Sequence, residues 1–311
     1  ADSVPGQLTA MVRGCIGRDD LMLLAGGYMP LKMRQNWPYY PMEVAGTVKG
    51  NLQSLSYSGF QLHLPTAFQL SSDGSLAHLH DMSQLKANIH LNARTYHLGF
   101  VTAMLDPSLM KEVRIPYGMS LKGDVEVDGS QYATKLTLTE GRGRVSVDAK
   151  VKTRMKKDGS IDMNQLAYQA RLKVHQLQVN HFLPHQELNT FSGNLEAHGL
   201  GTDFLSRRTR LTAKAEVSQL HYGKYHISHL TADAHVAQGK IHANIDSNNP
   251  LLKGLVSLDA LTGSKDVEGT IVADVKNVDL YQLGLTRVPM TATVCGQVDL
   301  KSDLKESHVV Q

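Results

Sequence analysis

The most regular feature of this chain is an alternation of apolar and polar residues that returns in five phrases. In each phrase three apolar residues stand at every second position, a step of three residues follows, and a short second apolar run completes it. Alternation with a period of two places the apolar side chains on one face of a β-strand. The phrases are Val48, Gly50, Leu52 with Leu55, Tyr57, Phe60; Ile89, Leu91, Ala93 with Tyr96, Leu98, Val101; Ala170, Leu172, Val174 with Leu177, Val179, Phe182; Ala213, Ala215, Val217 with Leu220, Tyr222, Tyr225; and Ile271, Ala273, Val275 with Val278, Leu280, Leu283.

The step of three residues inside each phrase changes the phase of the alternation. It would turn the second run to the opposite face unless the strand bends there, as it does at a β-bulge. We therefore expect a bulge in each phrase. Prolines follow four phrases, and because proline cannot donate a ladder hydrogen bond, they indicate where strands leave the sheet. These prolines are Pro65, Pro107, Pro184 and Pro289.

Further strands and turns fill the intervals between the phrases. Residues 119–127 and 145–151 alternate, and the sequence Gly-Arg-Gly at 141–143 predicts a hairpin turn. Further turns are expected at Asp158 with Gly159 and at Asn248, Asn249 and Pro250. A short helix is expected at Arg18 to Leu24, and one or two helical turns at Ser108 to Val113 after Pro107. A helical period is not sustained over the roughly twelve residues of a typical helix. Short turns between strands require antiparallel neighbours, so the predicted class is all-β.

A sheet with one apolar face must cover that face in some way. A sandwich or barrel covers it with another part of the same sheet, whereas a long sheet curled into a gutter leaves an apolar trough. The repeated phrases favour the second architecture: an elongated, curled antiparallel sheet of repeated strands that forms an apolar groove. We expect an irregular entry segment at residues 1–42, the repetitive sheet at 43–303, and a tail or truncation point at 304–311.

Composition excludes several functional classes. The net charge is +3 and charged residues make up 20% of the chain, which is neither the basic surface of a nucleic-acid-binding protein nor an acidic tail. The sequence shows neither an apolar stretch of the roughly 18 residues that a membrane-spanning helix needs nor a signal peptide. These features fit an internal piece of a larger protein and also a cytosolic chain.

The two cysteines, Cys15 and Cys295, are expected to be free and mostly buried.

The fifteen histidines raise the question of a metal site. His181 and His185 have the spacing of a zinc-hydrolase helix, but Phe182 replaces the required glutamate and Pro184 would break the helix. Neither a nucleophile elbow nor a phosphate-binding loop is present. We therefore predict no enzyme, no metal and no cofactor. A hydrolase built on a histidine cluster is a remote third hypothesis. The clusters are His78, His80 and Asp81; His175, His181 and His185; and His221, His226 and His229.

Several stretches resemble the AsmA-like family, in particular its TamB (translocation and assembly module) branch of Bacteroidetes type. They are residues 245–261 (IDSNNPLLKGLVSLDAL), 269–285 (GTIVADVKNVDLYQLGL), 85–116 and 171–184, and the resemblance spans about residues 43–303. Its motifs are hydrophobic patterns. The resemblance implies a periplasmic β-groove, tethered to the inner membrane in the full-length protein, that moves phospholipid to the outer membrane. It also implies an outer-membrane barrel partner, bound through parts outside this segment.

The groove hypothesis assigns the apolar residues of the phrases to contacts with phospholipid acyl chains. The candidates are Val48, Leu52, Ile89, Leu91, Leu172, Val174, Ala215, Val217, Ile271 and Val275. The alternative is a structural or adhesive β-repeat protein whose own side chains fill the apolar face and whose surface binds protein partners. The residues alone leave open whether the face is exposed or filled.

Overall fold

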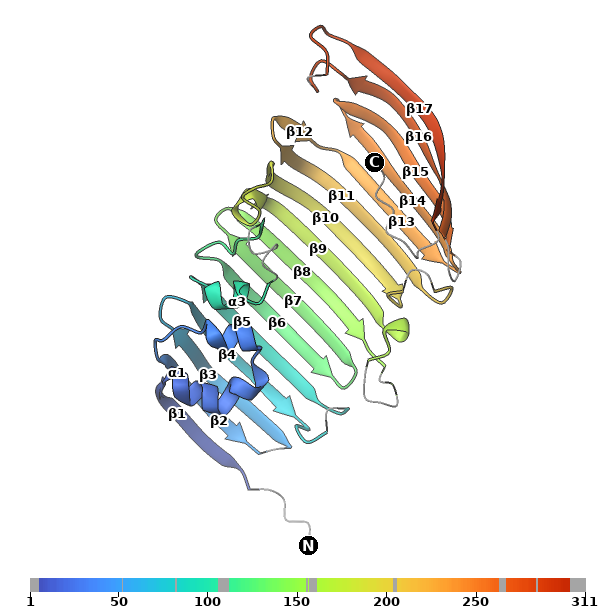
Figure 1. Cartoon of the computed structure of the whole chain (residues 1–311). Coiled ribbons are helices and arrows are strands. Elements are labelled where there is room, and N and C mark those ends of the chain that lie inside the picture. Colours follow the sequence, from blue (N-terminus) through green and yellow to red (C-terminus); the bar gives the residue numbers. More distant parts are fainter. Residues whose placement is uncertain are drawn as a thin grey trace. The chain divides into compact units, whose positions relative to one another are not determined.

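A computed structural model describes residues 6–51, 53–81, 83–105, 112–154, 156, 161–203, 206–262, 267–283 and 285–302. Strands account for 63% of the chain and helices for 9%, so the predicted all-β class is confirmed. The described residues form 17 strands of one antiparallel sheet that is not closed (Figure 1). The chain divides into two compact units, residues 1–148 with 176–188, and residues 149–175 with 189–311.

The described part of the first unit consists of strands that follow one another along the chain and of short helices. Its antiparallel ladders join β1 to β2 and continue in chain order to β7. The strands are β1 (Leu8–Ile16), β2 (Met42–Gly50), β3 (Ser54–Leu64), β4 (Phe68–Ala77), β5 (Lys86–Thr95), β6 (Ser120–Asp128) and β7 (Gln131–Glu140). The helices are α1 (Arg18–Ala25), α2 (Leu31–Gln35) and α3 (Gly99–Thr102), with the 3-10 turns η1 (Gly26–Tyr28) and η3 (Val179–His181).

The second unit repeats this hairpin arrangement. Strand β11 pairs first with β13 and then with the short β12, and the ladders continue in chain order from β13 to β17. Its strands are β10 (Leu188–Leu200), β11 (Arg210–Tyr222), β12 (Tyr225–Ile227), β13 (Leu230–Ala237), β14 (Lys240–Asn249), β15 (Leu252–Thr262), β16 (Val267–Asp279) and β17 (Thr291–Ser302), with the 3-10 turn η2 (Met163–Gln165). Strands β8 (Gly143–Lys152) and β9 (Ala167–Gln178) have residues in both units.

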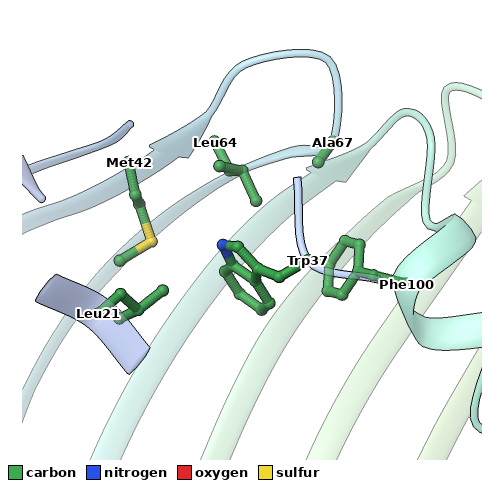
Figure 2. Close-up of a cluster of buried hydrophobic side chains, with 6 residues drawn as sticks. All are labelled: Leu21, Trp37, Met42, Leu64, Ala67 and Phe100. Atoms are coloured by element: carbon green, nitrogen blue, oxygen red, sulfur yellow. The ribbon is translucent and has the colours of Figure 1, made fainter. Parts of the chain in front are cut away.

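A small core lies in the first unit, where α1 and α3 pack on one end of the sheet (Figure 1). The Trp37 ring lies 4.8 Å from the Phe100 ring and is surrounded by side chains from α1 and from the neighbouring strand ends (Figure 2). The cluster consists of Leu21, Trp37, Met42, Leu64, Ala67 and Phe100. The predicted short helix is confirmed by α1, whereas β1 lies within the segment expected to be irregular.

The step of three residues has a different structural cause in each phrase. In the fifth phrase it is the predicted bulge, because the register of β16 against β17 shifts between Val275 and Val278. In the third phrase the backbone of Gln176, within β9, has a φ of 47°, so the strand departs from the extended conformation at the step. In the fourth phrase the pairing of β11 changes after Val217, and Leu220 pairs with β12 instead of β13.

The first phrase does contain a bulge, because the register of β3 against β4 shifts between Tyr57 and Phe60, but it lies in the second run of the phrase. At the step of three residues that separates the two runs, the prediction of a bulge is wrong for the first two phrases. In the first phrase, the step falls in the turn between β2, which ends at Gly50, and β3, which begins at Ser54. In the second, β5 ends at Thr95, before the second run begins. A chain that leaves the sheet changes phase without a bulge, so the same sequence pattern arises at strand ends.

The predicted turns and cysteines have mixed outcomes. The turn at 141–143 separates β7 from β8, and the turn at Asn249 and Pro250 separates β14 from β15. The expected helical turn at Ser108 to Val113 and the turn at Asp158 with Gly159 lie largely or wholly outside the described residues. Both cysteines are free, but they are exposed, so the prediction of burial is wrong. The reason is register: Cys15 stands opposite Glu43, and Cys295 opposite Asp274, on the polar face of the sheet.

Candidate functional site

The register of the second unit gathers its apolar residues on one face, which we call the second apolar face. Residues that are directly opposite one another on β11 and β13 to β17 form four cross-strand rows. The rows are Leu211, Val236, Ile241, Ala260, Gly269, Leu300; Ala213, Ala234, Ala243, Leu258, Ile271, Val298; Ala215, Ala232, Ile245, Val256, Ala273, Gly296; and Val217, Leu230, Ser247, Gly254, Val275, Val294.

The second apolar face carries no charged residue in these rows, and most of it remains partly exposed. Only Val236, Ala260 and Ser247 are buried. Val298 is 57% exposed and Ile245 52% exposed. Exposed fractions of this size show that no second layer of described residues covers these positions.

The first unit carries an equivalent surface, the first apolar face. The rows across β3 to β7 again hold no charged residue: Leu62, Leu70, Ala93, Leu121, Leu138; Phe60, Ser72, Leu91, Gly123, Leu136; Tyr57, Gly74, Ile89, Val125, Thr134; and Leu55, Leu76, Ala87, Val127, Tyr132. Strand β2 extends the rows through Val44 and Val48. The α1 and α3 cluster covers one end of this face, where Val44, Leu62 and Phe68 pack against the buried residues.

The size of these faces is unusual for a soluble chain. With about 4.8 Å between strands and about 6.7 Å between residues on one face, six strands and four rows span on the order of 800 Å². The largest apolar patch on a typical monomer is about 300–600 Å² and often marks a binding site. The second apolar face alone therefore exceeds that range, which makes it a candidate binding surface.

Aromatic side chains fill parts of both faces locally. A Cβ built on Gly74 would stand 2.7 Å from the Tyr57 hydroxyl oxygen, so the Tyr57 ring lies over this glycine. In the second unit Tyr168 lies over Gly199 in the same way, at 2.6 Å from its hydroxyl oxygen. Desolvation in this position raises the pKa of Tyr168. These rings fill the space above the two glycines, which have no side chains, but the neighbouring aliphatic side chains remain partly exposed.

The opposite face of each unit is polar, and its charges are arranged in cross-strand pairs. His90 Nδ1 lies 2.8 Å from Asp124 Oδ1 and His242 Nδ1 lies 2.6 Å from Asp259 Oδ1. Arg171 forms an ion pair with Glu196 at 3.3 Å. The charged side chains are largely exposed, so the pairs contribute little stability. Each unit therefore has one face whose cross-strand rows carry no charge and one face rich in charges.

Nine of the ten predicted lipid-contact residues are described, and all nine are half-buried on an apolar face. Val48 and Ile89 belong to one row of the first unit, since Val48 pairs with Tyr57, Tyr57 with Gly74, and Gly74 with Ile89. Leu91 lies in the adjacent row. In the second unit Ala215, Val217, Ile271 and Val275 lie in three of the four rows, and Leu172 and Val174 alternate on β9. Leu52 lies outside the described residues.

The prediction missed several prominent residues of the second apolar face. Ile245 on β14, Val256 and Leu258 on β15, and Val294 and Val298 on β17 lie in its rows. Their strands alternate as cleanly as the five phrases but lack the step of three residues. A search for alternation alone would have found them.

The histidine clusters do not assemble a metal or catalytic centre within the described residues, where no three histidine, cysteine or acidic side chains could hold a metal ion. The His221 and His226 rings lie 4.0 Å apart as cross-strand neighbours. His181 Nδ1 lies 2.7 Å from the nearly buried Glu140 carboxylate. These histidines have ordinary cross-strand and ion-pair contacts.

Comparisons with known proteins do not identify the chain: no family model, no curated protein and no solved structure matches it. None of the helices in the described ranges is long and apolar enough to cross a membrane. The interpretation of the site therefore depends on the geometry of the two apolar faces and on the resemblance noted in the sequence.

Proposed function

We propose that this chain is a periplasmic segment of an AsmA-like, TamB-type bridge that shields phospholipid acyl chains during transport to the outer membrane and supports outer-membrane biogenesis. The observation that carries the proposal is the exposure of a continuous uncharged face, seen in each unit separately. The inner-membrane tether, the periplasmic location and an outer-membrane barrel partner are proposed from the family resemblance.

The energetics of lipid transfer explain why such a surface would be useful. Burial of one methylene contributes about 0.8 kcal/mol, and the two acyl chains of a phospholipid contain on the order of thirty of them. Passage of the bare chains through water would cost on the order of 20 kcal/mol. An uncharged sheet face removes part of this cost at every position along the path. The role requires no reaction, so the proposed protein is not an enzyme and uses no cofactor.

The small residues of the second apolar face suit this role. One central row has Ala213, Ala234 and Ala243 beside one another, followed by the larger Leu258, Ile271 and Val298 on β15 to β17. Alanine leaves space above the sheet, whereas leucine and isoleucine provide contact area for a hydrocarbon chain. Because side chains stand roughly perpendicular to a sheet, this composition gives an uneven surface that an acyl chain can follow.

The second candidate function is a structural or adhesive β-repeat protein with a self-filled apolar face and protein partners. The aromatic rings over glycines favour it, because Tyr57 over Gly74 and Tyr168 over Gly199 occupy space that a lipid would otherwise use. The exposed aliphatic residues of β14 and β17 favour the lipid role. The two functions differ in whether the purified chain carries lipid.

The experiment is organic extraction of the purified chain followed by mass spectrometry. We expect phospholipid in a fixed molar ratio, reduced by Leu172→Asp and by Val275→Asp, because a carboxylate on an apolar face repels an acyl chain. Lys173→Glu is the matched control, since Lys173 is exposed on the polar face of the same strand as Leu172. The unfolding midpoint of each variant shows whether it is folded. Absence of lipid from the parent chain in every preparation would contradict the proposal and favour the self-filled repeat.

A further inference from the structure

The polar face of the first unit contains a hollow that differs from the rest of that face. It has a volume of about 680 Å³, which is within the usual range of about 300–1,000 Å³ for ligand pockets. Two cross-strand rows form its floor. The rows are Glu43, His63, Gln69, Arg94, Ser120 and Gln61, Ser71, Asn92, Lys122.

The charge of this hollow is positive. Its one acidic side chain, Glu43, contacts His63 Nδ1 at 3.1 Å. Arg94 and Lys122 stand on neighbouring strands β5 and β6, and neither takes part in an ion pair within the described residues. Hollows on the polar face of the second unit also contain cations, and each holds an ion pair of a basic side chain with a carboxylate, Arg171 with Glu196 in one and Lys301 with Glu268 in the other. The first hollow therefore offers two unpaired cations to an anionic ligand.

The other polar side chains of the lining, apart from the paired Glu43 and His63, are amides and hydroxyls, and Leu62, Leu70 and Gly118 complete it. Gln61, Gln69 and Asn92 each provide both donor and acceptor atoms, which can bind two neighbouring hydroxyl groups of one ligand. The Tyr96 hydroxyl donates to Gln69 Oε1 at 3.4 Å, which leaves the amide NH2 group of Gln69 to donate to a ligand. A single small anion would contact only a few of these groups.

An aromatic pair stands at the rim of the hollow. Gly118 lines the hollow, and the adjacent Tyr117 is 64% exposed with its ring 5.3 Å from the Tyr96 ring. The Arg94 guanidinium lies 6.0 Å from the centre of the Tyr96 ring. Exposed aromatic rings beside amides are suited to the apolar face of a sugar ring, because the ring binds C–H groups while the amides bind hydroxyls.

We propose that this hollow binds an acidic oligosaccharide, a chain of sugars that carries carboxylate or phosphate groups. Arg94 and Lys122 bind the anionic group, Gln61, Gln69 and Asn92 bind ring hydroxyls, and Tyr117 stacks on a sugar at the rim. The hollow lies on the face opposite the first apolar face, so the site is independent of the lipid function proposed above, and the failure of either leaves the other intact.

The test is isothermal titration calorimetry with trigalacturonate, with maltotriose as the neutral sugar and inorganic phosphate as the simple anion. We expect saturable binding of trigalacturonate and binding at least about tenfold weaker for maltotriose and for phosphate. Arg94→Gln and Lys122→Gln each weaken trigalacturonate binding by about tenfold or more. Lys135→Gln, an exposed cation on the neighbouring strand β7 outside the hollow, leaves it unchanged.

Three outcomes would overturn the proposal. The first is the absence of saturable trigalacturonate binding, and the second is equal binding by the parent chain and the Arg94→Gln variant. The third is phosphate binding as tight as trigalacturonate binding, which would show a simple anion site. Arg94-dependent sedimentation with phosphatidylglycerol vesicles, without trigalacturonate binding, would assign the hollow to a membrane surface instead. All three substituted side chains are exposed, so the unfolding midpoints are expected to match the parent.

Discussion

Individual glycines allow aromatic side chains of the apolar faces to lie close to the backbone of the sheet. Gly74 lies under the Tyr57 ring, and the Tyr57 hydroxyl bonds the Ser72 hydroxyl at 3.0 Å. Ser72 in turn donates to the His90 carbonyl at 2.8 Å. The one buried polar side chain in the rows of this face is thereby hydrogen-bonded, as buried polar groups usually are. The alternation predicts that Tyr57 and Gly74 share a face, but their contact depends on cross-strand register, which the local sequence does not contain.

Replacement of Gly74 by alanine is predicted to destabilise the first unit by about 1–3 kcal/mol. The added Cβ would stand 2.4 Å from the Asn88 carbonyl oxygen, and this backbone atom cannot move without shifting β5. Gly14→Ala is the matched control, because nothing lies within 4 Å of a Cβ there. Urea unfolding monitored by circular dichroism measures both. Equal stability of Gly74→Ala and the parent would contradict the close approach of both the Asn88 carbonyl and the Tyr57 ring to Gly74.

Cys295 provides a second test at the residue scale. Its thiol donates to Asp274 Oδ1 at 3.5 Å, and this hydrogen bond, together with partial desolvation and the negative charge of Asp274, raises the pKa of Cys295. Because the thiolate is the reactive form, Asp274→Asn should lower that pKa and speed alkylation at pH 8 several-fold. Iodoacetamide labelling in a Cys15→Ser background measures the rate. Asp299→Asn, which removes a more distant charge, should change it little; equal effects would contradict the contact.

At the scale of elements, the alternation predicts strands well and their ends less well. Residues 119–127 and 145–151 become β6 and β8 with bounds shifted by only a few residues. Strand β1 lies in the segment expected to be irregular, although Leu8, Ala10, Val12, Gly14 and Ile16 alternate there as in the other strands. The steps of three residues were assigned to bulges, whereas two coincide with strand ends. The local sequence shows that the phase of the alternation changes. Only the pairing with a neighbouring strand shows whether a bulge or a strand end causes the change.

The helical cluster of the first unit is an element-scale feature that the sequence did not predict. Its members come from α1, α3, the segment after α2, strands β2 and β3 and the turn after β3, and Trp37 is only 6% exposed. Trp37→Ala is predicted to destabilise the first unit by about 3–5 kcal/mol, because it leaves a cavity beside Phe100. Leu23→Ala on α1, at a side chain that is 85% exposed, should change stability little. The measurement is the midpoint of thermal unfolding of each variant. Equal midpoints for Trp37→Ala and Leu23→Ala would contradict the place of Trp37 in the core.

At the scale of the whole molecule, the uncharged rows explain the candidate function and why part of it was predictable. Nine predicted contact residues lie on the apolar faces because the alternation alone decides on which side of a strand a residue stands. The continuity of the rows across six strands, for example from Ala213 to Val298, follows from register. The polar hollow around Arg94 also depends on register, since its residues are separated by up to about eighty positions in the chain.

The central claim, that acyl chains contact one face of the sheet, is tested most directly by site-specific photocrosslinking on β16. A photoreactive amino acid is placed in turn at Ile271 and Ala273, which lie on the second apolar face, and at Val272, which is 43% exposed on the opposite face. With phospholipid present, we predict lipid adducts at Ile271 and Ala273 and none at Val272. Adducts of equal yield at all three positions, or at none, would contradict the account.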